Sequence, residues 1–142
     1  MFAATPLLGL PVLIYNLFVF SLAGAFQAPD ANARLSLPLF SLRTAAGAVW
    51  PVSTGDLIVA GSLLVLFIEL LKSTASRRAA IVNHALSVLL FVICLVELLL
   101  APAFASSTFC LITLMVLLDV LAGFFITIAQ ARREADVIDD RY

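Results

Sequence analysis

The residues in this sequence that are best suited to chemistry are a few polar side chains inside long apolar stretches. The stretches Leu57 to Leu71, Ala85 to Ala101 and Leu111 to Ala129 carry one acidic residue each. A charged group at the centre of a membrane-spanning helix costs about 2.5–3.5 kcal/mol, so such groups normally face other helices and find a partner. The residues that we expect to make polar contacts inside a membrane are Asn16, Glu69, His84, Ser87, Glu97 and Asp119.

The depth of each polar group along its helix predicts which groups meet. With a rise of about 1.5 Å per residue, Asn16 and Asp119 lie close to the membrane midplane. The antiparallel helices that contain Ser87 and Asp119 bring these two residues to within about one helical turn of each other. We therefore expect Asn16 and Ser87 to be the hydrogen-bond partners of Asp119.

Two further contacts follow from the same comparison of depths. Glu69 and His84 lie at similar depth in the cytoplasmic half of the membrane, which predicts that they pair. Glu69 can instead pair with Lys72, which lies one turn later on its own helix. Glu97 lies near the outer surface, where it reaches water or Thr113 on the neighbouring helix.

These groups fit a structural role or a role in binding an ion. A buried carboxyl that hydrogen-bonds across helices fixes their register, and we favour this role for Asp119. The alternative is a proton or cation site, for which one acid at the midplane is the minimum requirement. His84 is the only histidine, which excludes a haem held by two histidines of one chain and leaves a single axial ligand open. We expect no cofactor and no metal site.

Enzymatic chemistry lacks its usual residues. A nucleophilic serine or cysteine needs a base within reach, and His84 is the only histidine that can serve. Ser87 lies one turn away from it, but deep in an apolar helix with no evident entry for water. The sequence also contains no glycine-rich phosphate loop and no metal-ligand spacing. We therefore expect a protein that is not an enzyme.

The composition indicates a helical protein that crosses a membrane several times. Hydrophobic residues make up 63% of the 142 residues and charged residues 12%, whereas soluble domains have about 45–50% and about 25%. The net charge of −1 argues against nucleic acid as a partner. Cys94 and Cys110 lie inside predicted spans, where a thiol usually behaves as a small apolar group.

Four spans of about 20 apolar residues, the length that crosses a hydrocarbon core, can be placed on the sequence. They cover residues 6–26, 53–73, 79–101 and 107–130. The segment MFAATP before the first span has no Lys or Arg, so we expect a helix there rather than a cleaved signal peptide. Ser53 and Asp56 fit the start of the second span as a cap, Pro102 closes the third, and SST at 106–108 caps the fourth. A polar extension of the last helix is expected through Ala135.

The segments between and within the spans carry further signals. Residues 27–52 form a predicted periplasmic loop, in which RLSLPLFSLR is typical of an extended segment or a short hairpin. Its Phe40 and Trp50 suit the headgroup boundary, where such aromatic residues collect. Small residues at Ala60-Gly61-Ser62 and Ala122-Gly123 predict close approach of neighbouring helices.

The distribution of basic residues predicts the orientation. The basic residues on the predicted cytoplasmic side are Lys72, Arg77, Arg78, Arg132, Arg133 and Arg141, and those on the outer side are Arg34 and Arg43. This bias places both termini in the cytoplasm, with residues 131–142 as a polar tail, and a bacterial-type inner membrane is the expected location. The predicted membrane-interface anchors are Trp50, Lys72, Arg77, Arg78, Arg132 and Arg133.

Together these patterns predict an all-α, polytopic membrane protein. Residues 1–142 form one up-down bundle of four transmembrane helices. We expect an accessory or assembly subunit that packs against a larger membrane complex, with an energy-converting complex as one candidate, or that forms a homo-oligomer in the lipid bilayer. The alternative is a small ion- or proton-coupled transporter or channel that uses Asp119 with Glu69 and His84.

Overall fold

The computed structural model of the protein describes residues 5–22, 24–73 and 77–139, with side chains described except at residues 73, 77–81, 130 and 133–139. The helices and strands are α1 (Gly9–Phe20), η2 (Ala25–Gln27), α2 (Ala31–Leu35), β1 (Pro38–Arg43), β2 (Val49–Ser53), α3 (Thr54–Ser73), α4 (Arg77–Leu100), η3 (Pro102–Phe104) and α5 (Ser107–Asp139). The described chain is mostly helical, as predicted. Three of its helices are long and apolar enough to cross a membrane, and they contain the segments Thr54–Lys72, Val82–Leu100 and Ser107–Ala129.

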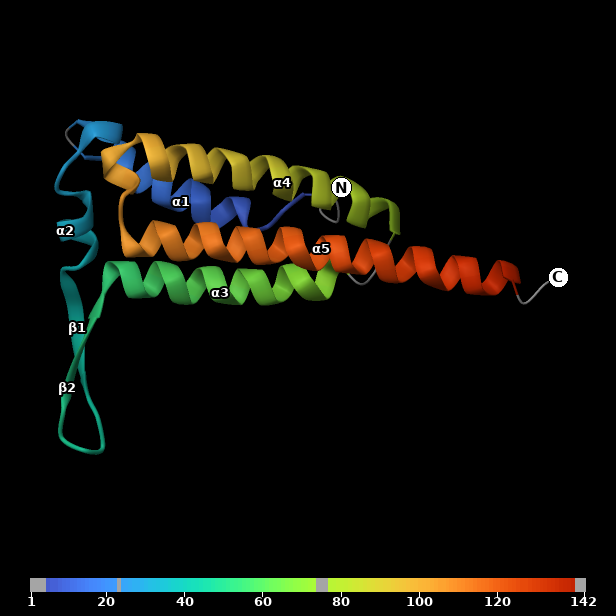
Figure 1. Cartoon of the computed structure of the whole chain (residues 1–142). Helices are drawn as coiled ribbons and strands as arrows, with labels where there is room; N and C mark the ends of the chain where they lie inside the picture. Colours follow the sequence, from blue (N-terminus) through green and yellow to red (C-terminus); the bar gives the residue numbers. More distant parts are fainter. Residues whose placement is uncertain (1–4, 23, 74–76, 140–142) are drawn as a thin grey trace.

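The helices α1, α3, α4 and α5 lie side by side in one elongated bundle (Figure 1). α5 packs extensively against both α3 and α4, and it also contacts α1. The strands β1 and β2 project from one end of the bundle, which we call the hairpin end. We call the opposite end, where α3 ends at Ser73 and α4 begins at Arg77, the distal end. α5 continues past the distal end of α3 and α4 (Figure 1).

The first helix is shorter than predicted. It covers 12 residues instead of residues 6–26, so it is about 18 Å long beside a hydrocarbon core of about 30 Å. The chain leaves the helix through Ser21 and turns at Gly24, whose φ of 94° is a left-handed conformation that glycine adopts without steric cost. The predicted span was wrong in its extent because apolar composition alone does not reveal this turn.

The starts of α3 and α5 agree with their sequence signals. The backbone N–H of Ser53 donates to the Asp56 carboxylate at 2.9 Å, and the N–H of Asp56 donates to the Ser53 hydroxyl at 3.2 Å. This reciprocal pair is a capping box at the start of α3. At the start of α5 the Ser106 hydroxyl accepts the backbone N–H of Phe109 at 3.1 Å. α5 then runs for 33 residues to Asp139, beyond the predicted end at Ala135.

The loop between α1 and α3 contains the expected hairpin and an unexpected helix. β1 and β2 pair antiparallel, with Leu42 opposite Trp50 and Phe40 opposite Val52. The hairpin side chains are exposed except at the end of β2, where Val52 is buried. The helix α2 precedes the hairpin and buries Leu35 against the bundle. It is only five residues long, too short for a periodic apolar pattern to predict it.

The core is densest at the hairpin end. There Tyr15, Phe104 and Phe109 form an aromatic cluster, with Tyr15 4.7 Å from Phe109 and 5.4 Å from Phe104 between ring centroids. The Tyr15 hydroxyl donates to the carbonyl of Ala103 at 3.2 Å and shares a hydrogen bond of 2.6 Å with the Ser106 hydroxyl. These contacts hold α1 against η3 and the start of α5.

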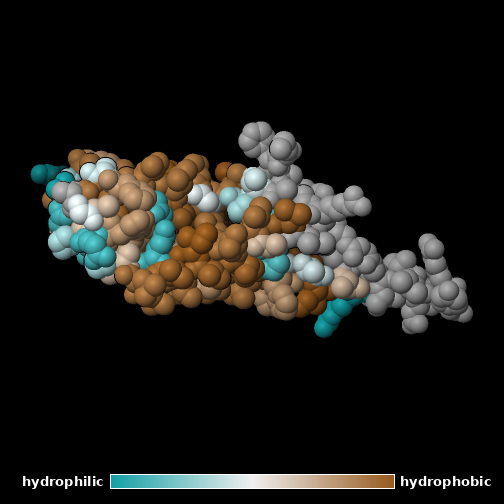
Figure 2. Space-filling model, turned by 90° about the horizontal axis from the view of Figure 1, so that it is seen from above, coloured by the Kyte–Doolittle hydropathy of each residue, from teal (hydrophilic) through white to brown (hydrophobic). Residues whose placement is uncertain are grey.

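The outer surface of the bundle is largely apolar. Figure 2 shows hydrophobic residues over the middle of the visible face and hydrophilic residues gathered near the hairpin end. An apolar groove of about 380 Å³ runs between α1 and α3, beside Leu10, Ile14 and Gly61. A Cβ atom added to Gly61 would meet nothing within 4 Å, so the space beside that glycine is open in the part of the chain that the structure describes, and the predicted close approach of a neighbouring helix there stays a prediction.

Candidate functional site

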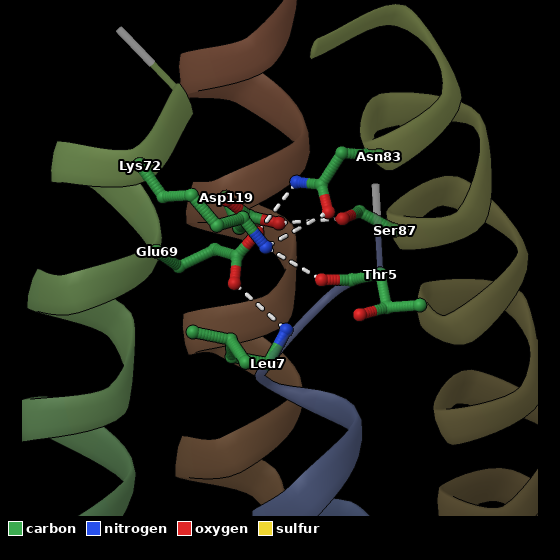
Figure 3. A network of polar contacts seen from close by, with 7 residues as sticks. All are labelled: Thr5, Leu7, Glu69, Lys72, Asn83, Ser87 and Asp119. Carbon is green, nitrogen blue, oxygen red and sulfur yellow. Dashed lines mark hydrogen bonds and ion pairs between the residues drawn. The ribbon is translucent and has the colours of Figure 1, made fainter. Parts of the chain in front are cut away.

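A cluster of polar groups lies near the distal end, where α3, α4, α5 and the segment before α1 meet (Figure 3). We call it the distal cluster. It consists of Thr5, Leu7, Glu69, Lys72, Asn83, Ser87 and Asp119. Four separate parts of the chain therefore contribute to one polar region inside the bundle.

The Glu69 carboxylate is the centre of the first half of the distal cluster. Its side chain is fully buried, and it forms an ion pair of 2.9 Å with Lys72, whose side chain is 18% exposed. The Asn83 amide donates to the same carboxylate at 2.5 Å, and the backbone N–H of Leu7 donates to it at 2.7 Å. Neutral dipoles from two other segments thus support the ion pair, which lowers the cost of burying it.

The Lys72 ammonium is held by the same segments. It donates to the backbone carbonyl of Thr5 at 2.5 Å and to the Asn83 side-chain oxygen at 3.4 Å. The carboxylate of Glu69 and the ammonium of Lys72 therefore each bind a backbone atom of the segment that precedes α1. This arrangement ties the beginning of the described chain to the end of α3.

The second half of the distal cluster is a contact between α4 and α5. The Ser87 hydroxyl donates to the Asp119 carboxylate at 2.6 Å, and both residues are buried. Asp119 also lies within electrostatic range of Glu69, Lys72 and His84. The predicted contact between Ser87 and Asp119 is present.

His84 lies beside this contact and packs against Gly123 of α5. A Cβ atom added to Gly123 would lie 2.6 Å from the Nδ1 atom of His84, so the glycine allows the two helices to approach at this point. The prediction of a close approach at Gly123 is confirmed. The Nδ1 atom is buried and has no hydrogen-bond partner among the residues that the structure describes.

The predicted pairing of Asp119 with Asn16 was wrong. The Asn16 amide donates to the Glu97 carboxylate at 3.3 Å, which joins α1 to α4. The Thr113 hydroxyl, which we expected to meet Glu97, donates to a carbonyl of its own helix at 2.9 Å. Glu97 is half-buried, so its expected contact with water stays a prediction. The shortness of α1 contributes to the error for Asn16, because a helix of 12 residues does not have its centre where a full span would have it.

Glu69 and His84, which we predicted to pair, each contact another residue. Asn83, one position earlier on α4, donates to Glu69, while His84 faces Gly123. The alternative partner, Lys72, does pair with Glu69. Equal depth could not distinguish position 83 from position 84, since neighbouring residues of a helix face different directions. The spacing of four residues between Asn83 and Ser87 was the signal that places both on one face.

The predicted interface anchors have different surroundings. Trp50 on the hairpin and Arg132 near the end of α5 are exposed, whereas Lys72 turns into the distal cluster. The side chains of Arg77, Arg78 and Arg133 lie outside the part of the chain whose side chains are described. Their predicted role remains a prediction. Cys94 is buried, Cys110 is exposed, and both are free thiols.

Neither a metal site nor a similar protein indicates a function for the described part of the chain. Within residues 5–22, 24–73 and 77–139, no three His, Cys, Asp or Glu side chains are grouped so that they could hold a metal ion. No family model, no curated protein and no solved structure matches the chain. The arrangement of its polar groups is therefore the basis for any functional proposal.

Proposed function

We propose that this protein is a non-catalytic accessory or assembly subunit that packs against a larger complex in a membrane. The observation that carries the proposal is the use of the polar groups at membrane depth to connect helices of the same chain. Asn83 with Glu69 connects α4 to α3, Ser87 with Asp119 connects α4 to α5, and Asn16 with Glu97 connects α1 to α4. Hydrogen bonds of this kind set the register of helices in a bundle.

The apolar exterior supports a role in packing. Leu64, Leu100 and Phe125 are among the most exposed large side chains, with 67%, 75% and 66% of their surfaces accessible. Contiguous apolar surface on this scale has to be covered by lipid or by another protein. The groove between α1 and α3 adds a recessed apolar surface beside which another helix can pack.

The proposal includes an orientation. We place α1 as a fourth, shorter crossing and both termini on the cytoplasmic side of a bacterial-type inner membrane, because Lys and Arg are concentrated beside the distal end. Reporter fusions after residue 76 and after residue 142 should report the cytoplasm, and a fusion near residue 45 should report the periplasm. A periplasmic signal from the fusion after residue 142 would contradict the orientation.

The subunit assignment is tested with Asp119 variants purified from the native membrane in a gentle detergent. The wild-type chain should elute with a larger complex at a fixed stoichiometry. Asp119→Asn should remain in that complex, because an amide oxygen can still accept the hydrogen bond from Ser87. Asp119→Leu should weaken the association, because it leaves the buried Ser87 hydroxyl without its acceptor.

A carrier would give a different set of results. It would purify as the chain alone, as a monomer or a homo-oligomer, and would drive proton-dependent flux in reconstituted vesicles. In that case Asp119→Asn should abolish the flux although the protein stays folded, because an amide cannot release a proton. Flux that disappears in a well-folded Asp119→Asn variant would refute the subunit assignment.

A further inference from the structure

The charges of the distal cluster do not balance. Its described side chains include two carboxylates, those of Glu69 and Asp119, but only one ammonium, that of Lys72. The ion pair between Glu69 and Lys72 accounts for one charge of each sign. Asp119 has a hydroxyl as its hydrogen-bond donor, and a buried carboxylate supported only by one neutral dipole is costly. One more positive charge would make the cluster neutral.

The packing of α4 against α5 indicates where that charge belongs. His84 and Ser87 lie one turn apart on α4, and Asp119 and Gly123 lie one turn apart on α5. The contacts between Ser87 and Asp119 and between His84 and Gly123 therefore form two successive layers of one interface. The buried, unpartnered Nδ1 atom of His84 lies in the layer next to the carboxyl. An imidazole nitrogen without a proton is an acceptor, and with a proton it becomes a donor on a cation.

We propose that Asp119, Ser87 and His84 form a binding site for one proton that exchanges with water at the distal end. A hydronium ion gives up the proton and leaves water behind. The proton forms an O–H bond on Asp119, or it forms an N–H bond on His84 and leaves Asp119 as a carboxylate beside an imidazolium. The described side chains of the distal cluster together with His84 are neutral in both forms and carry one negative charge without the proton.

The surroundings of the site favour a proton over a metal ion. The charged groups that face it are Glu69 and Lys72 from α3, while the segment before α1 contributes backbone atoms of Thr5 and Leu7. A metal cation needs several oxygen ligands. The carbonyl of Thr5 and the side-chain oxygen of Asn83 are already directed at the ammonium of Lys72.

This site goes beyond the role of an accessory subunit and does not depend on it. Proton binding alters the charge between α4 and α5 without any requirement that the proton crosses the membrane. The interface between these two helices would then respond to pH on the distal side, whether the protein is part of a larger complex or alone.

The single histidine makes the test specific. Protein without a histidine tag, labelled with ¹⁵N-histidine and placed in lipid nanodiscs, is titrated with acid while NMR follows the imidazole nitrogens of His84. The C=O band of a protonated carboxylic acid is followed by infrared spectroscopy in parallel. In the wild type the imidazole signals should report two protonation steps, and the acid band should disappear as the pH rises. Asp119→Asn should lose one step and the share of the band that Asp119 contributes, while the other acidic residues keep theirs.

Control variants separate this site from other acids and from folding defects. Glu97→Gln removes the acid that binds Asn16 and should retain both steps. Ser87→Ala should shift the acid band, because the hydroxyl that donates to Asp119 is gone, and it provides a second reading if Asp119→Asn does not fold. Signal dispersion in the NMR spectra reports the fold of every variant.

Three results would overturn the proposal. The first is a single imidazole step that is identical in the wild type and in Asp119→Asn, with an acid band that is also the same in both proteins at every pH. The second is loss of the Asp119 share of the band on addition of Na⁺ or K⁺ at constant pH, which would assign the site to a metal cation. The third is an Asp119 share of the band that is absent in the wild type and arises only when Arg77 and Arg78 are both replaced by Gln, which would make an arginine the missing charge.

Discussion

The two ends of the bundle are held together by different interactions. At the hairpin end, α1 is fixed by aromatic packing, and the Tyr15 hydroxyl bonds to neutral groups. At the distal end, the chain before α1 is fixed by the carboxylate of Glu69 and the ammonium of Lys72, each bound to a backbone atom. Packing responds little to pH or salt, whereas buried charges respond strongly to the loss of one partner. We therefore expect changes in pH or salt to leave the packing at the hairpin end unchanged and to affect the contacts at the distal end.

The largest effect should come from removing an aromatic ring at the hairpin end. Phe104 is fully buried against Tyr15 and Phe109, and Phe104→Ala should lower the free energy of unfolding by about 3–5 kcal/mol. The measurement is unfolding from mixed micelles at increasing mole fractions of a denaturing detergent. Phe125→Ala, at a ring that is 66% exposed, is the control and should cost less than about 0.5 kcal/mol. Equal losses for the two variants would mean that the aromatic cluster does not hold this end.

The next largest effect should come from neutralising Glu69. Glu69→Gln leaves the ammonium of Lys72 without its ion pair, and we expect a loss of about 3 kcal/mol, the lower end for a buried pair, since Lys72 is partly exposed. The same unfolding measurement applies. Replacing both residues by Gln should cost less than Glu69→Gln alone, because no unpaired charge then remains and the two amides can still bond to the backbone of Leu7 and Thr5. A double variant that is less stable than the single one would contradict the account of the distal end.

A smaller effect is expected where α4 and α5 approach. Gly123→Ala places a methyl group 2.6 Å from the Nδ1 atom of His84 and should cost about 1–3 kcal/mol. Combining it with His84→Ala should recover part of that loss, and the double-mutant cycle measures how much. Gly61→Ala is the matched control, since its added methyl group meets nothing. A similar loss at both glycines would assign the effect to the helix backbone and not to the contact with His84.

The smallest effect concerns an exposed ion pair of the loop at the hairpin end. The guanidinium of Arg34 donates to the Asp30 carboxylate at 2.8 Å, and this hydrogen bond holds the pKa of Asp30 below its ordinary value. The stabilisation is therefore present above the pKa of Asp30 in the unfolded chain and is lost as the pH falls through the lowered pKa of the folded state. The free energy of unfolding of Asp30→Asn should be slightly lower than that of the wild type near neutral pH and equal to it in acid. A stability difference that grows as the pH falls would mean that folding raises the pKa of Asp30 instead of lowering it.

Sequence patterns that depend on residues close together in the chain predicted their parts of the fold well. The reciprocal contacts of Ser53 with Asp56 involve residues three positions apart, and the hairpin follows from alternating residues and a turn. Both depend on neighbours in the chain. The end of α1 depends on the left-handed turn at Gly24, and small residues such as glycine also occur inside helices, so apolar composition could not locate it.

The distal cluster was predictable only in part. Equal depth in antiparallel helices was sufficient to find Ser87 opposite Asp119, but it could not assign Asn83 to Glu69 and His84 to Gly123. That choice depends on the rotation of each helix about its axis. The backbone atoms of Thr5 and Leu7 carry no side-chain signature, so no reading of residue types could identify them as partners.

The length of α1 has a consequence for the thickness of the surrounding bilayer. This helix of 12 residues is attached to α3 through Leu7, just before its start, and to η3 through Tyr15 in its middle, so it cannot slide to match its longer neighbours. If α1 crosses the membrane as proposed, lipids beside it meet an apolar surface shorter than the hydrocarbon layer, and such mismatch is relieved when the layer thins locally. We therefore expect short-tailed lipids to gather on the α1 side, and the protein to favour thinner membranes over thicker ones.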